Sequence, residues 1–383
     1  MHTPVSAPGA TLGILGGGQL GRMTVLAGRQ LGYRFHIYTP EKDSPASAVA
    51  DASTVAPFDD TAALQTFAKQ VDRVTFEFEN IPATTLQHLE ATTIVHPQSQ
   101  ILRTCQNRLL EKNFLKRAGF PCAPFAAVHS PETLAQAIDI IGTPCVLKST
   151  EGGYDGKGQV HLKTRPADAA QIWHSLDAPR AILEQWVDFE IECSVICARN
   201  EHGQITAFPV AENHHHQHIL HSSIAPARLN PTIQKNATDL ALAITQNLEI
   251  VGILAVEFFV THDAKLLVNE LAPRPHNSGH YSLDACLTSQ FEQHIRAVCG
   301  LPLGATDLLH PTAMINLLGD LWHNGHPPNW NILLNDPKIK LHLYGKRTPR
   351  KGRKMGHFCI SDSDLEQAES KAKQLFKELN QPN

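Results

Sequence analysis

Two glutamates, Glu257 and Glu270, are the residues whose placement most strongly suggests chemistry. Both lie in nearly apolar runs that read as strands joined by a short turn. A tight hairpin centred between Asp263 and Ala264 would place them directly opposite each other on one face. Like charges in that position repel unless a cation lies between them, and carboxylates beside phosphates suit Mg²⁺. The alternative is a pair of solvated glutamates on the rim of a hairpin.

A glycine-rich segment at residues 152–158 could close over a phosphate. It holds four glycines in seven residues and follows a strand-like run that ends at Lys148. Its backbone amides can approach phosphate oxygens, and the cationic heads of Lys148 and Lys157 can neutralise a phosphoryl group in transfer. The segment is not a P-loop, because the GxxxxGK[ST] pattern is absent. A flexible surface hairpin is the alternative interpretation.

An earlier glycine loop, residues 16–21, satisfies the GxGxxG pattern between a strand-like run and a helix-like run. Such a loop brings backbone amides and a helix N-terminus near a phosphate. A dinucleotide site would also need an acidic residue at the end of the second strand, where the sequence has Tyr38, Thr39 and Pro40. A phosphate-bearing substrate is therefore favoured over a purely structural turn, and NAD binding is the least favoured interpretation.

Two more segments concentrate polar groups. Residues 270–280 combine histidine, asparagine, serine and arginine between an apolar strand and a helix, which suggests a ligand unless Asn277 or Ser278 merely caps a helix. Residues 346–354 hold six cations in nine positions. A run of this kind is usually a solvated face or a nucleic-acid patch. Because the chain is acidic overall, a phosphate on a small substrate is the functional alternative.

The elements that carry these residues change in type along the chain. The first hundred residues alternate strand-like and helix-like runs, which predicts βαβ units and a parallel sheet. From about Arg108 strands, a hairpin and a long helix follow in an α+β layout, and after Gly300 the sequence becomes proline-rich, which suggests a small, loop-rich terminal domain. We therefore predict an α/β and α+β architecture in three domains, residues 1–107, 108–300 and 301–383.

Composition narrows the class of protein. The 383 residues are 42% hydrophobic with a net charge of −4, which is typical of globular domains and disfavours binding to nucleic acid or an anionic membrane. The N-terminus lacks the pattern of a secretory signal, and no apolar run approaches the roughly 18 residues that span a bilayer. Because the eight cysteines are scattered without a CxxC pair, we expect reduced thiols in a cytoplasmic enzyme.

Five motifs together resemble those of one family, the ATP-grasp enzymes named 5-(carboxyamino)imidazole ribonucleotide synthases. The motifs extend over nearly the whole chain, and their combination is more specific than any single one. They lie at residues 16–23, 76–80, 152–159, 269–280 and 350–357. The resemblance implies a Rossmann-like pre-ATP-grasp domain, a central ATP-grasp domain and a small C-terminal domain. One departure is His218, where the family tends to have glycine.

The resemblance also implies a reaction and an assembly. Bicarbonate attacks the γ-phosphate of ATP to give carboxyphosphate. This intermediate, or the CO₂ that it releases, is captured by the exocyclic amine of 5-aminoimidazole ribonucleotide. The products are the N-carboxylated ribonucleotide, ADP and phosphate, in de novo purine biosynthesis. A homodimer is expected. The alternatives are an ATP-grasp ligase that uses formate, an NAD-dependent oxidoreductase and a non-catalytic nucleotide-binding protein.

Site residues follow from the resemblance, position by position. ATP is expected to contact Arg108, Lys148, Gly153, Tyr154, Asp155, Gly156, Lys157, Gly158, Gln159, Glu184, Gln185, Trp186, Val187, Glu192, His215, Asn269 and Glu270. The ribonucleotide is expected to contact Gly18, Gln19, Leu20, Glu77, Arg274, His276, Asn277, Ser278, Lys346, Arg350, Lys351 and Arg353. Glu257 and Glu270 are the expected Mg²⁺ ligands, and the expected catalytic residues are Lys148, Tyr154, Arg274 and Lys351.

Overall fold

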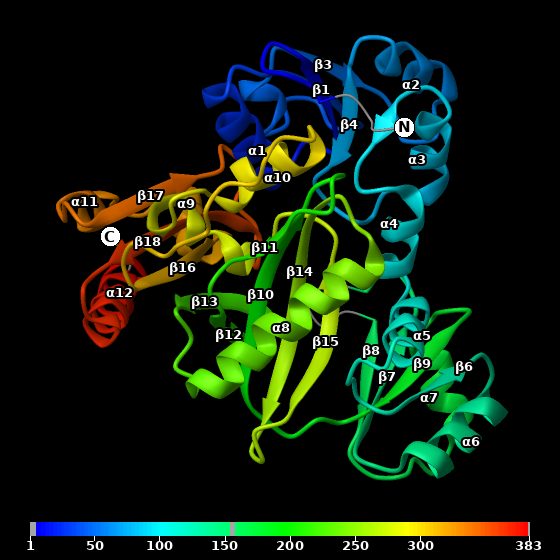
Figure 1. Ribbon diagram of the computed structural model, residues 1–383. Coiled ribbons are helices and arrows are strands. Elements are labelled where there is room, and N and C mark those ends of the chain that lie inside the picture. The colour runs from blue at the N-terminus through cyan, green and yellow to red at the C-terminus, as the bar shows by residue number, and fades with distance from the viewer. Residues whose placement is uncertain (1–4, 154–157, 382–383) are drawn as a thin grey trace.

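The computed structural model describes residues 5–153 and 158–381 and contains three β-sheets with helices packed around them (Figure 1). The N-terminal sheet lies at the top of the view in Figure 1, a four-stranded sheet lies at the lower right, and a long sheet runs through the centre to the C-terminal elements at the left. Within the described residues, no helix combines the length and the apolar character needed to cross a membrane.

The N-terminal sheet is parallel, with strand order β3-β2-β1-β4-β5. Its strands are β1 (Thr11–Leu15), β2 (Arg34–Thr39), β3 (Ala52–Val55), β4 (Arg73–Phe76) and β5 (Ile94–Val95). The helices of this part are α1 (Gln19–Gln30), α2 (Thr61–Ala68), α3 (Ala83–Glu90) and α4 (Ser99–Gln106). The predicted βαβ alternation and parallel sheet are confirmed.

The four-stranded sheet is antiparallel, with order β6-β9-β7-β8. Its strands are β6 (Phe125–Val128), β7 (Cys145–Ser149), β8 (Gln159–Leu162) and β9 (Ala181–Gln185), and its helices are α6 (Pro131–Ile141) and α7 (Ala169–Ser175). Apolar side chains of both helices pack on the sheet. The glycine-rich segment that follows Lys148 is the connection between β7 and β8, and helix α5 (Arg108–Arg117) precedes this sheet in the chain.

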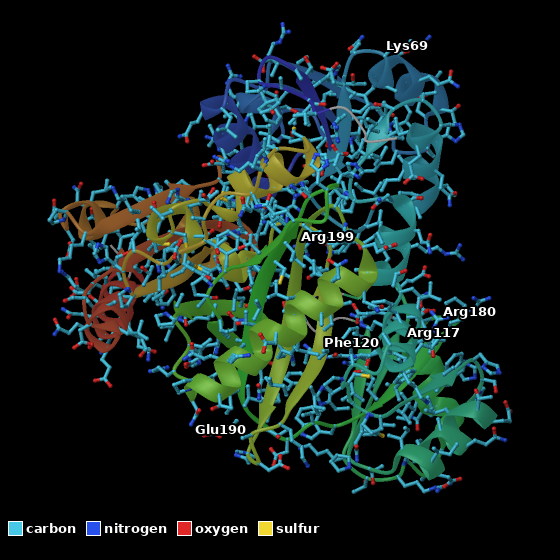
Figure 2. The ribbon with its side chains drawn as sticks, viewed as in Figure 1. Lys69, Arg117, Phe120, Arg180, Glu190 and Arg199 are labelled. Atoms are coloured by element: carbon cyan, nitrogen blue, oxygen red, sulfur yellow. The ribbon has the colours of Figure 1, made fainter. Side chains whose placement is uncertain are left out.

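The long sheet has nine strands, ordered β15-β14-β10-β12-β13-β16-β18-β17, with β11 paired to β10. Its strands are β10 (Phe189–Arg199), β11 (Ile205–Ala207), β12 (Ala211–His216), β13 (Ile219–Ala225), β14 (Gly252–Thr261), β15 (Leu266–Ala272), β16 (Thr312–Leu318), β17 (Ile339–Leu343) and β18 (Lys354–Ser361). Glu190 and Arg199 mark the two ends of β10 (Figure 2). The helices around it include α8 (Pro231–Leu248), α10 (Gln290–Val298) and α12 (Leu365–Leu379).

The C-terminal segment is more regular than the sequence suggests. Its prolines lie in irregular stretches, as expected, but between them stand strands β16, β17 and β18 and the 15-residue helix α12. Strands β16 and β18 are buried on nearly every residue, so they lack the polar–apolar alternation that identifies a half-buried strand. Strand β16 also pairs with β13, so the C-terminal strands continue the central sheet.

The β14–β15 hairpin places Glu257 opposite Glu270, as predicted. The predicted centre of its turn is wrong, however, because Val260 pairs with Leu266 and the turn is therefore centred on Asp263. The register shifts by one residue between Glu257 and Phe258, and Asn269 is the extra residue on β15. This β-bulge restores the alignment of the two glutamates.

Candidate active site

A cleft of about 840 Å³ is lined from one side by β7, β8 and β9 and from the other by β10, β14 and β15. In Figure 1 these two sets of strands face each other below the N-terminal sheet. Sixteen of the predicted site residues line the cleft. They are Arg108, Lys148, Gly153, Gln159, Glu184, Gln185, Trp186, Val187, Glu192, His215, Glu257, Asn269, Glu270, Arg274, His276 and Asn277.

The remaining predicted residues fall into other groups. Tyr154, Asp155, Gly156 and Lys157 lie outside the described residues. Gly158 lies in the turn immediately before β8, and Ser278 is fully buried behind His276. Arg350 and Lys351 are exposed in a turn of the basic segment. A second cluster, away from the cleft lining, contains Gly18, Gln19, Leu20, Glu77, Lys346 and Arg353.

Lys148 reaches the cleft from β7 and is held by Glu184 on β9. The Lys148 Nζ donates a hydrogen bond to Glu184 Oε2 at 2.9 Å, because β7 and β9 are neighbouring antiparallel strands. Burial opposes ionisation of Glu184, but Lys112 and Lys148 outweigh it and lower the pKa of this carboxyl. Glu184 Oε1 is buried and has no hydrogen-bond partner among the described residues. An acceptor is therefore left for a donor that the described chain does not supply.

Lys112 is a buried cation that the sequence gives no reason to single out. It is 2% exposed on α5, and its Nζ donates to the carbonyl oxygens of Val268 at 3.2 Å and Asn269 at 2.8 Å. These carbonyls belong to the bulged part of β15 next to Glu270. Lys112 thus connects the helix before the four-stranded sheet to the strand that carries the acidic pair.

Arg108 is engaged with the base of the glycine-rich segment. Its Nη1 donates to the Ser149 carbonyl at 2.9 Å, and its Nη2 donates to the Gly153 carbonyl at 2.8 Å. The Arg108 amide also donates to the Thr150 carbonyl at 2.9 Å. Arg108 therefore fixes the strand end from which this segment emerges, in addition to lining the cleft.

The acidic pair has the electrostatics of a cation site. Glu270 is accessible to water in the cleft, yet the protein packed around it raises the pKa of its carboxyl, and the Glu257 carboxylate raises it further. For Glu257 burial also opposes ionisation, but His276, His215 and Arg274 outweigh it and lower the pKa. Two facing carboxylates with opposite shifts resist simultaneous ionisation, and a divalent cation between them would remove that conflict.

Arg274 and His276 follow β15 and point in different directions. Arg274 binds the Glu79 carboxylate through two nitrogens, with Nη2 at 2.6 Å from Oε1. His276 Nε2 lies 3.0 Å from Glu257 Oε1. Glu79, just beyond β4 in the N-terminal part of the chain, is a site residue that sequence reasoning missed, although its motif at residues 76–80 had been recognised.

The first glycine loop folds around a protein carboxylate. The backbone amides of Gly18 and Gly21, at the N-terminus of α1, donate to the two oxygens of Glu77. A Cβ on Gly16 or Gly18 would lie less than 3 Å from the Glu77 side chain, which requires glycine there. These two amides therefore serve Glu77, and a substrate phosphate would have to use other groups nearby.

Lys346 is the member of the basic segment that lies nearest to this cluster. Burial lowers its pKa to about 8, with Arg353 lowering it further and Glu77 opposing the shift. Its Nζ donates to the Lys354 carbonyl at 2.8 Å. The exposed Arg347 instead pairs with Asp43 at 3.1 Å. The basic segment thus divides into a half that faces the cluster and a half that faces solvent.

His215 and Glu192 form an ion pair on the floor of the cleft, from neighbouring strands β12 and β10. Burial disfavours the charged imidazole, but Glu192 outweighs it and raises the pKa of His215. The turn after β12 places Gln217 and His218 at φ values of 50° and 64°. A two-residue hairpin turn of type I′ needs positive φ at both positions. This explains why glycine suits the position of His218 and shows that histidine still forms the turn.

Comparison with protein families identifies the class. The family model of the ATP-grasp domain matches residues 113–291, which include strands β7, β8, β9, β10, β14 and β15 of the cleft. The model of the ribonucleotide synthetase preATP-grasp domain matches residues 9–106, and that of the phosphoribosylaminoimidazole carboxylase C-terminal domain matches residues 312–371. The chain is an ATP-grasp enzyme with the pre-ATP-grasp and C-terminal parts that its motifs imply.

Individual relatives narrow the class to one family. The N5-carboxyaminoimidazole ribonucleotide synthase of Bacillus subtilis is 48% identical over 94% of this chain and 93% of its own length. The Staphylococcus aureus N5-carboxyaminoimidazole synthetase, solved with ADP, is 37% identical over 98% of this chain and 99% of that one, with a TM-score of 0.89. The Aspergillus clavatus enzyme, solved with ADP and 5-aminoimidazole ribonucleotide, is 29% identical over 97% and 98%, with a TM-score of 0.87. The chain belongs to the N5-carboxyaminoimidazole ribonucleotide synthase family of ATP-dependent ligases.

Proposed function

We propose that this chain carboxylates 5-aminoimidazole ribonucleotide with bicarbonate at the expense of ATP, through carboxyphosphate, with Mg²⁺ as the metal. The observation that carries the proposal is the pairing of Glu257 with Glu270 in the same cleft as Lys148. The complex of the Aspergillus clavatus relative with ADP and the ribonucleotide supports this choice of substrates.

The residues present fit a magnesium ion. Mg²⁺ is commonly bound by one or two carboxylates together with substrate phosphates and water, and the hairpin offers two carboxylates on one face. The raised pKa of Glu270 and the lowered pKa of Glu257 indicate a like-charge conflict that such an ion would relieve. When bound, the ion would neutralise developing phosphoryl charge. Glu257 and Glu270 would hold it.

The nucleotide is proposed to lie along the cleft with its phosphates toward the acidic pair. Lys148, held by Glu184, would contact the phosphates, and the glycine-rich segment anchored by Arg108 would cover them. Glu184 Oε1, which has no hydrogen-bond partner in the part of the chain that the structure describes, offers an acceptor to a donor group of the nucleotide. These residues would position the reactants and exclude water from a short-lived acyl phosphate. Positioning of this kind accounts for much of how proteins catalyse phosphoryl transfer.

The ribonucleotide is proposed to lie between Arg274 and the cluster around Glu77, Lys346 and Arg353. Two cations beside an anchored carboxylate suit a sugar phosphate, because the cations bind phosphate and the carboxylate accepts from hydroxyl groups. The exposure of Lys351 makes Lys346 and Arg353 stronger candidates for phosphate binding than Lys351.

The activity itself is tested by substrate dependence. ATP hydrolysis should require bicarbonate and should be strongly stimulated by 5-aminoimidazole ribonucleotide, with the N-carboxylated product trapped and identified. Hydrolysis that responds to formate and not to bicarbonate would reject the carboxylation in favour of a formate-using ligase. Titration with NADH should show no binding.

The metal assignment is tested by Glu270→Gln. Metal stabilisation of phosphoryl transfer is worth several kcal/mol, and each 1.36 kcal/mol is tenfold in rate. We therefore expect kcat/KM to fall by at least about 100-fold while Tm is no lower than that of the wild type, because the change removes a like-charge repulsion. The matched control is Glu190→Gln, an exposed glutamate on β10 outside the cleft (Figure 2), which should keep full activity. Near-normal turnover of Glu270→Gln would remove this glutamate from the metal site.

We also propose a homodimer and a cytoplasmic location. Leu287 and Leu309 are 59% and 50% exposed and lie in adjacent segments, which gives an apolar surface that a second subunit could cover. All eight cysteines are free, as is usual in a reducing compartment. Light scattering after size-exclusion chromatography, which would return twice the chain mass for a dimer, tests the assembly.

A further inference from the structure

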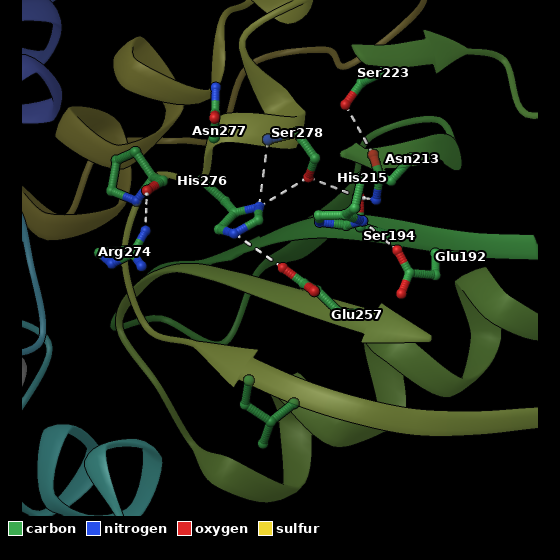
Figure 3. A network of polar contacts seen from close by, with 12 residues as sticks. Glu192, Ser194, Asn213, His215, Ser223, Glu257, Arg274, His276, Asn277 and Ser278 are labelled. Atoms are coloured by element: carbon green, nitrogen blue, oxygen red, sulfur yellow. Dashed lines mark hydrogen bonds and ion pairs between the residues drawn. The ribbon is translucent and has the colours of Figure 1, made fainter. Parts of the chain in front are cut away.

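A row of buried polar side chains runs from the middle of the long sheet to His276 (Figure 3). Ser223 Oγ lies 2.8 Å from Asn213 Oδ1, and Asn213 Nδ2 lies 2.9 Å from Ser194 Oγ. Ser194 Oγ lies 2.7 Å from Ser278 Oγ, which lies 2.9 Å from His276 Nδ1. The row ends where His276 Nε2 meets Glu257 Oε1 at 3.0 Å.

The sheet register brings these groups together. Asn213 on β12 is the cross-strand partner of Ser223 on β13, and Ser194 on β10 is the cross-strand partner of Glu257 on β14. Ser194 and Ser278 are 1% and 0% exposed. Because water is excluded, each hydroxyl proton must be used within the row, and an unsatisfied one would cost about 1–3 kcal/mol.

The row has a direction. The Ser223 hydroxyl donates to Asn213 Oδ1, so Asn213 presents its amide nitrogen to Ser194, and Ser194 passes its own proton to Ser278. Ser278 then donates to His276 Nδ1. The backbone amide of Ser278, whose hydrogen is fixed by the peptide plane, also points at Nδ1 at 3.3 Å. Both donors require Nδ1 to be an acceptor.

A neutral imidazole carries one proton, so an acceptor Nδ1 places that proton on Nε2, directed at Glu257. The reverse arrangement, with the proton on Nδ1, would set the lone pair of Nε2 against the Glu257 carboxylate and leave the Ser278 amide facing an N–H. The tautomer of a metal-site histidine is usually set by the hydrogen bond of its other nitrogen. In this protein, the hydrogen bond to Nδ1 comes from the last member of the four-residue row Ser223, Asn213, Ser194 and Ser278.

We propose that Ser194 and Ser278 are positioning residues that keep His276 in the Nε2–H tautomer and so hold the Glu257 carboxylate in place for the metal. Asn213 allows this because it presents a donor, and not an acceptor, to Ser194, which leaves the Ser194 proton for Ser278. The tautomer assignment stands on the hydrogen-bond geometry alone. Its consequence for metal binding rests on the function proposed above.

The test is Asn213→Asp, which exchanges the donor for an acceptor of the same shape. Ser194 would then donate to the new carboxylate and Ser278 to Ser194, so that Nδ1 of His276 loses its hydroxyl donor. In the metal-free protein, the ¹⁵N chemical shifts of the His276 ring, assigned by difference from His276→Gln, should report Nε2–H in the wild type. In the variant they should report a smaller Nε2–H fraction, because only the Ser278 amide still donates to Nδ1. In the complete assay, the Mg²⁺ concentration for half-maximal activity should rise by about tenfold or more.

Two further variants distinguish an effect passed along the hydrogen-bonded row, which we call the relay, from a direct effect of the negative charge introduced at position 213. Asn213→Ala leaves Ser194 free to donate to Ser278 and should keep the wild-type tautomer. The double variant Ser194→Ala/Asn213→Asp keeps the new acceptor but interrupts the row, so it should return the His276 shifts toward wild type. Thr245→Val, which removes a buried hydroxyl on α8, controls for loss of stability and should alter neither readout.

The outcomes are decisive in both directions. A wild-type His276 with its proton on Nδ1 would overturn the proposal whether or not any variant folds. An identical shift in Asn213→Asp and in the double variant would assign the effect to charge and would also overturn it. If the tautomer responds as expected while the Mg²⁺ requirement does not, the relay stands and the metal assignment of Glu257 fails.

Discussion

At the scale of single residues, the position of Arg274 depends on Glu79. The two side chains are 195 residues apart in sequence, and the carboxylate of Glu79 binds two nitrogens of the guanidinium. This pairing fixes the orientation of a planar donor group that we place against the ribonucleotide. Arg274, which we propose faces the ribonucleotide, is therefore held by the N-terminal part of the chain.

Glu79→Gln should consequently impair use of the ribonucleotide. Loss of the ion pair releases the Arg274 side chain, and a displacement of about 1 Å in a positioning group can cost up to about 100-fold in rate. We expect kcat/KM for 5-aminoimidazole ribonucleotide to fall by about tenfold or more, while KM for ATP changes little. Steady-state kinetics with each substrate varied in turn measures both.

The matched control for Glu79→Gln is Asp139→Asn. Asp139 also binds an arginine, Arg165, but on the exposed surface of the four-stranded sheet domain. Its loss should leave both kinetic parameters unchanged. A fall in kcat/KM for ATP as large as that for the ribonucleotide would show that Glu79 supports the whole cleft and not Arg274 in particular.

Sequence reasoning at this scale succeeded where partners are close in the chain. Glu257 and Glu270 belong to one hairpin, so the hairpin pattern alone suggested their pairing, and the bulge at Asn269 compensates for the misplaced centre of the turn. Glu79 and Lys112 were missed because their partners, Arg274 and the carbonyls of residues 268 and 269, lie more than 150 residues away. No local pattern records such a contact. The roles of the individual site residues stay predictions.

At the scale of elements, the basic turn at residues 350–353 is held against Gly319. The Gly319 amide donates to the Arg353 carbonyl at 2.8 Å, and a Cβ at position 319 would lie 2.2 Å from the Arg350 carbonyl oxygen. Backbone atoms cannot rotate away as a side chain can. Only glycine therefore allows the turn to approach the end of β16 this closely.

Gly319→Ala should displace this turn and, with it, Arg353. We expect KM for the ribonucleotide to rise several-fold and KM for ATP to stay the same, because the turn lies outside the lining of the nucleotide cleft. The control is Gly119→Ala. Its φ of 76° disfavours alanine, but a Cβ there meets no atom within 4 Å, so this variant measures the effect of a strained backbone without a steric clash. Equal kinetic effects of the two variants would separate the turn from substrate binding.

Element prediction was most accurate where periodicity was clear. The strand-like and helix-like runs predicted on either side of the glycine loop at residues 16–21 are β1 and α1. Strands β16 and β18 were missed because both of their faces are buried, which removes the alternation. The bulge at Asn269 was also missed, since an extra residue in a strand leaves no mark in composition.

At the scale of the whole molecule, the buried His294 and the partly buried His96 join the N-terminal part of the chain to the elements around the long sheet. His294 on α10 bonds to Thr75 on β4 at 2.8 Å, and His96 lies 3.8 Å from Glu201, which also binds Arg73. Burial lowers the pKa of His294 to about 3, and burial together with Arg73 lowers that of His96 to about 4. Both therefore stay neutral in the folded protein at pH values where the unfolded chain takes up protons.

Stability should accordingly fall as the solution is acidified. An unfolded histidine has a pKa near 6.5, so between about pH 6.5 and pH 4 the unfolded state binds more protons than the folded one. Over this range, each histidine lowers the free energy of unfolding by up to about 1.4 kcal/mol for each pH unit of acidification. The stability that the neutral histidine provides is fully present above pH 6.5. The urea midpoint should decrease from pH 7.5 to pH 5.

His294→Gln should flatten this dependence, because glutamine does not titrate and can still bond to Thr75. The control is His88→Gln, an exposed histidine on α3, which should leave the slope as it is. An unchanged slope in His294→Gln would assign the acid sensitivity to other groups in the molecule.

The overall architecture was predictable because each part has its own pattern: alternation of strands and helices first, then hairpins around glycine-rich and acidic segments. The fold class is confirmed by the three family matches. Continuity of the long sheet across Gly300 was not predictable, since the pairing of β13 with β16 joins residues about ninety positions apart. The domain boundaries at residues 107 and 300 stay predictions.

That continuity limits how the chain can be divided in the laboratory. A protein ending at Gly300 would lose β16, and β13 would become an open edge with free amide and carbonyl groups. Open edges recruit strands from other molecules, so such a fragment should aggregate instead of binding nucleotide as an isolated module. Anyone who wants the nucleotide-binding half alone will have to supply a substitute strand along β13.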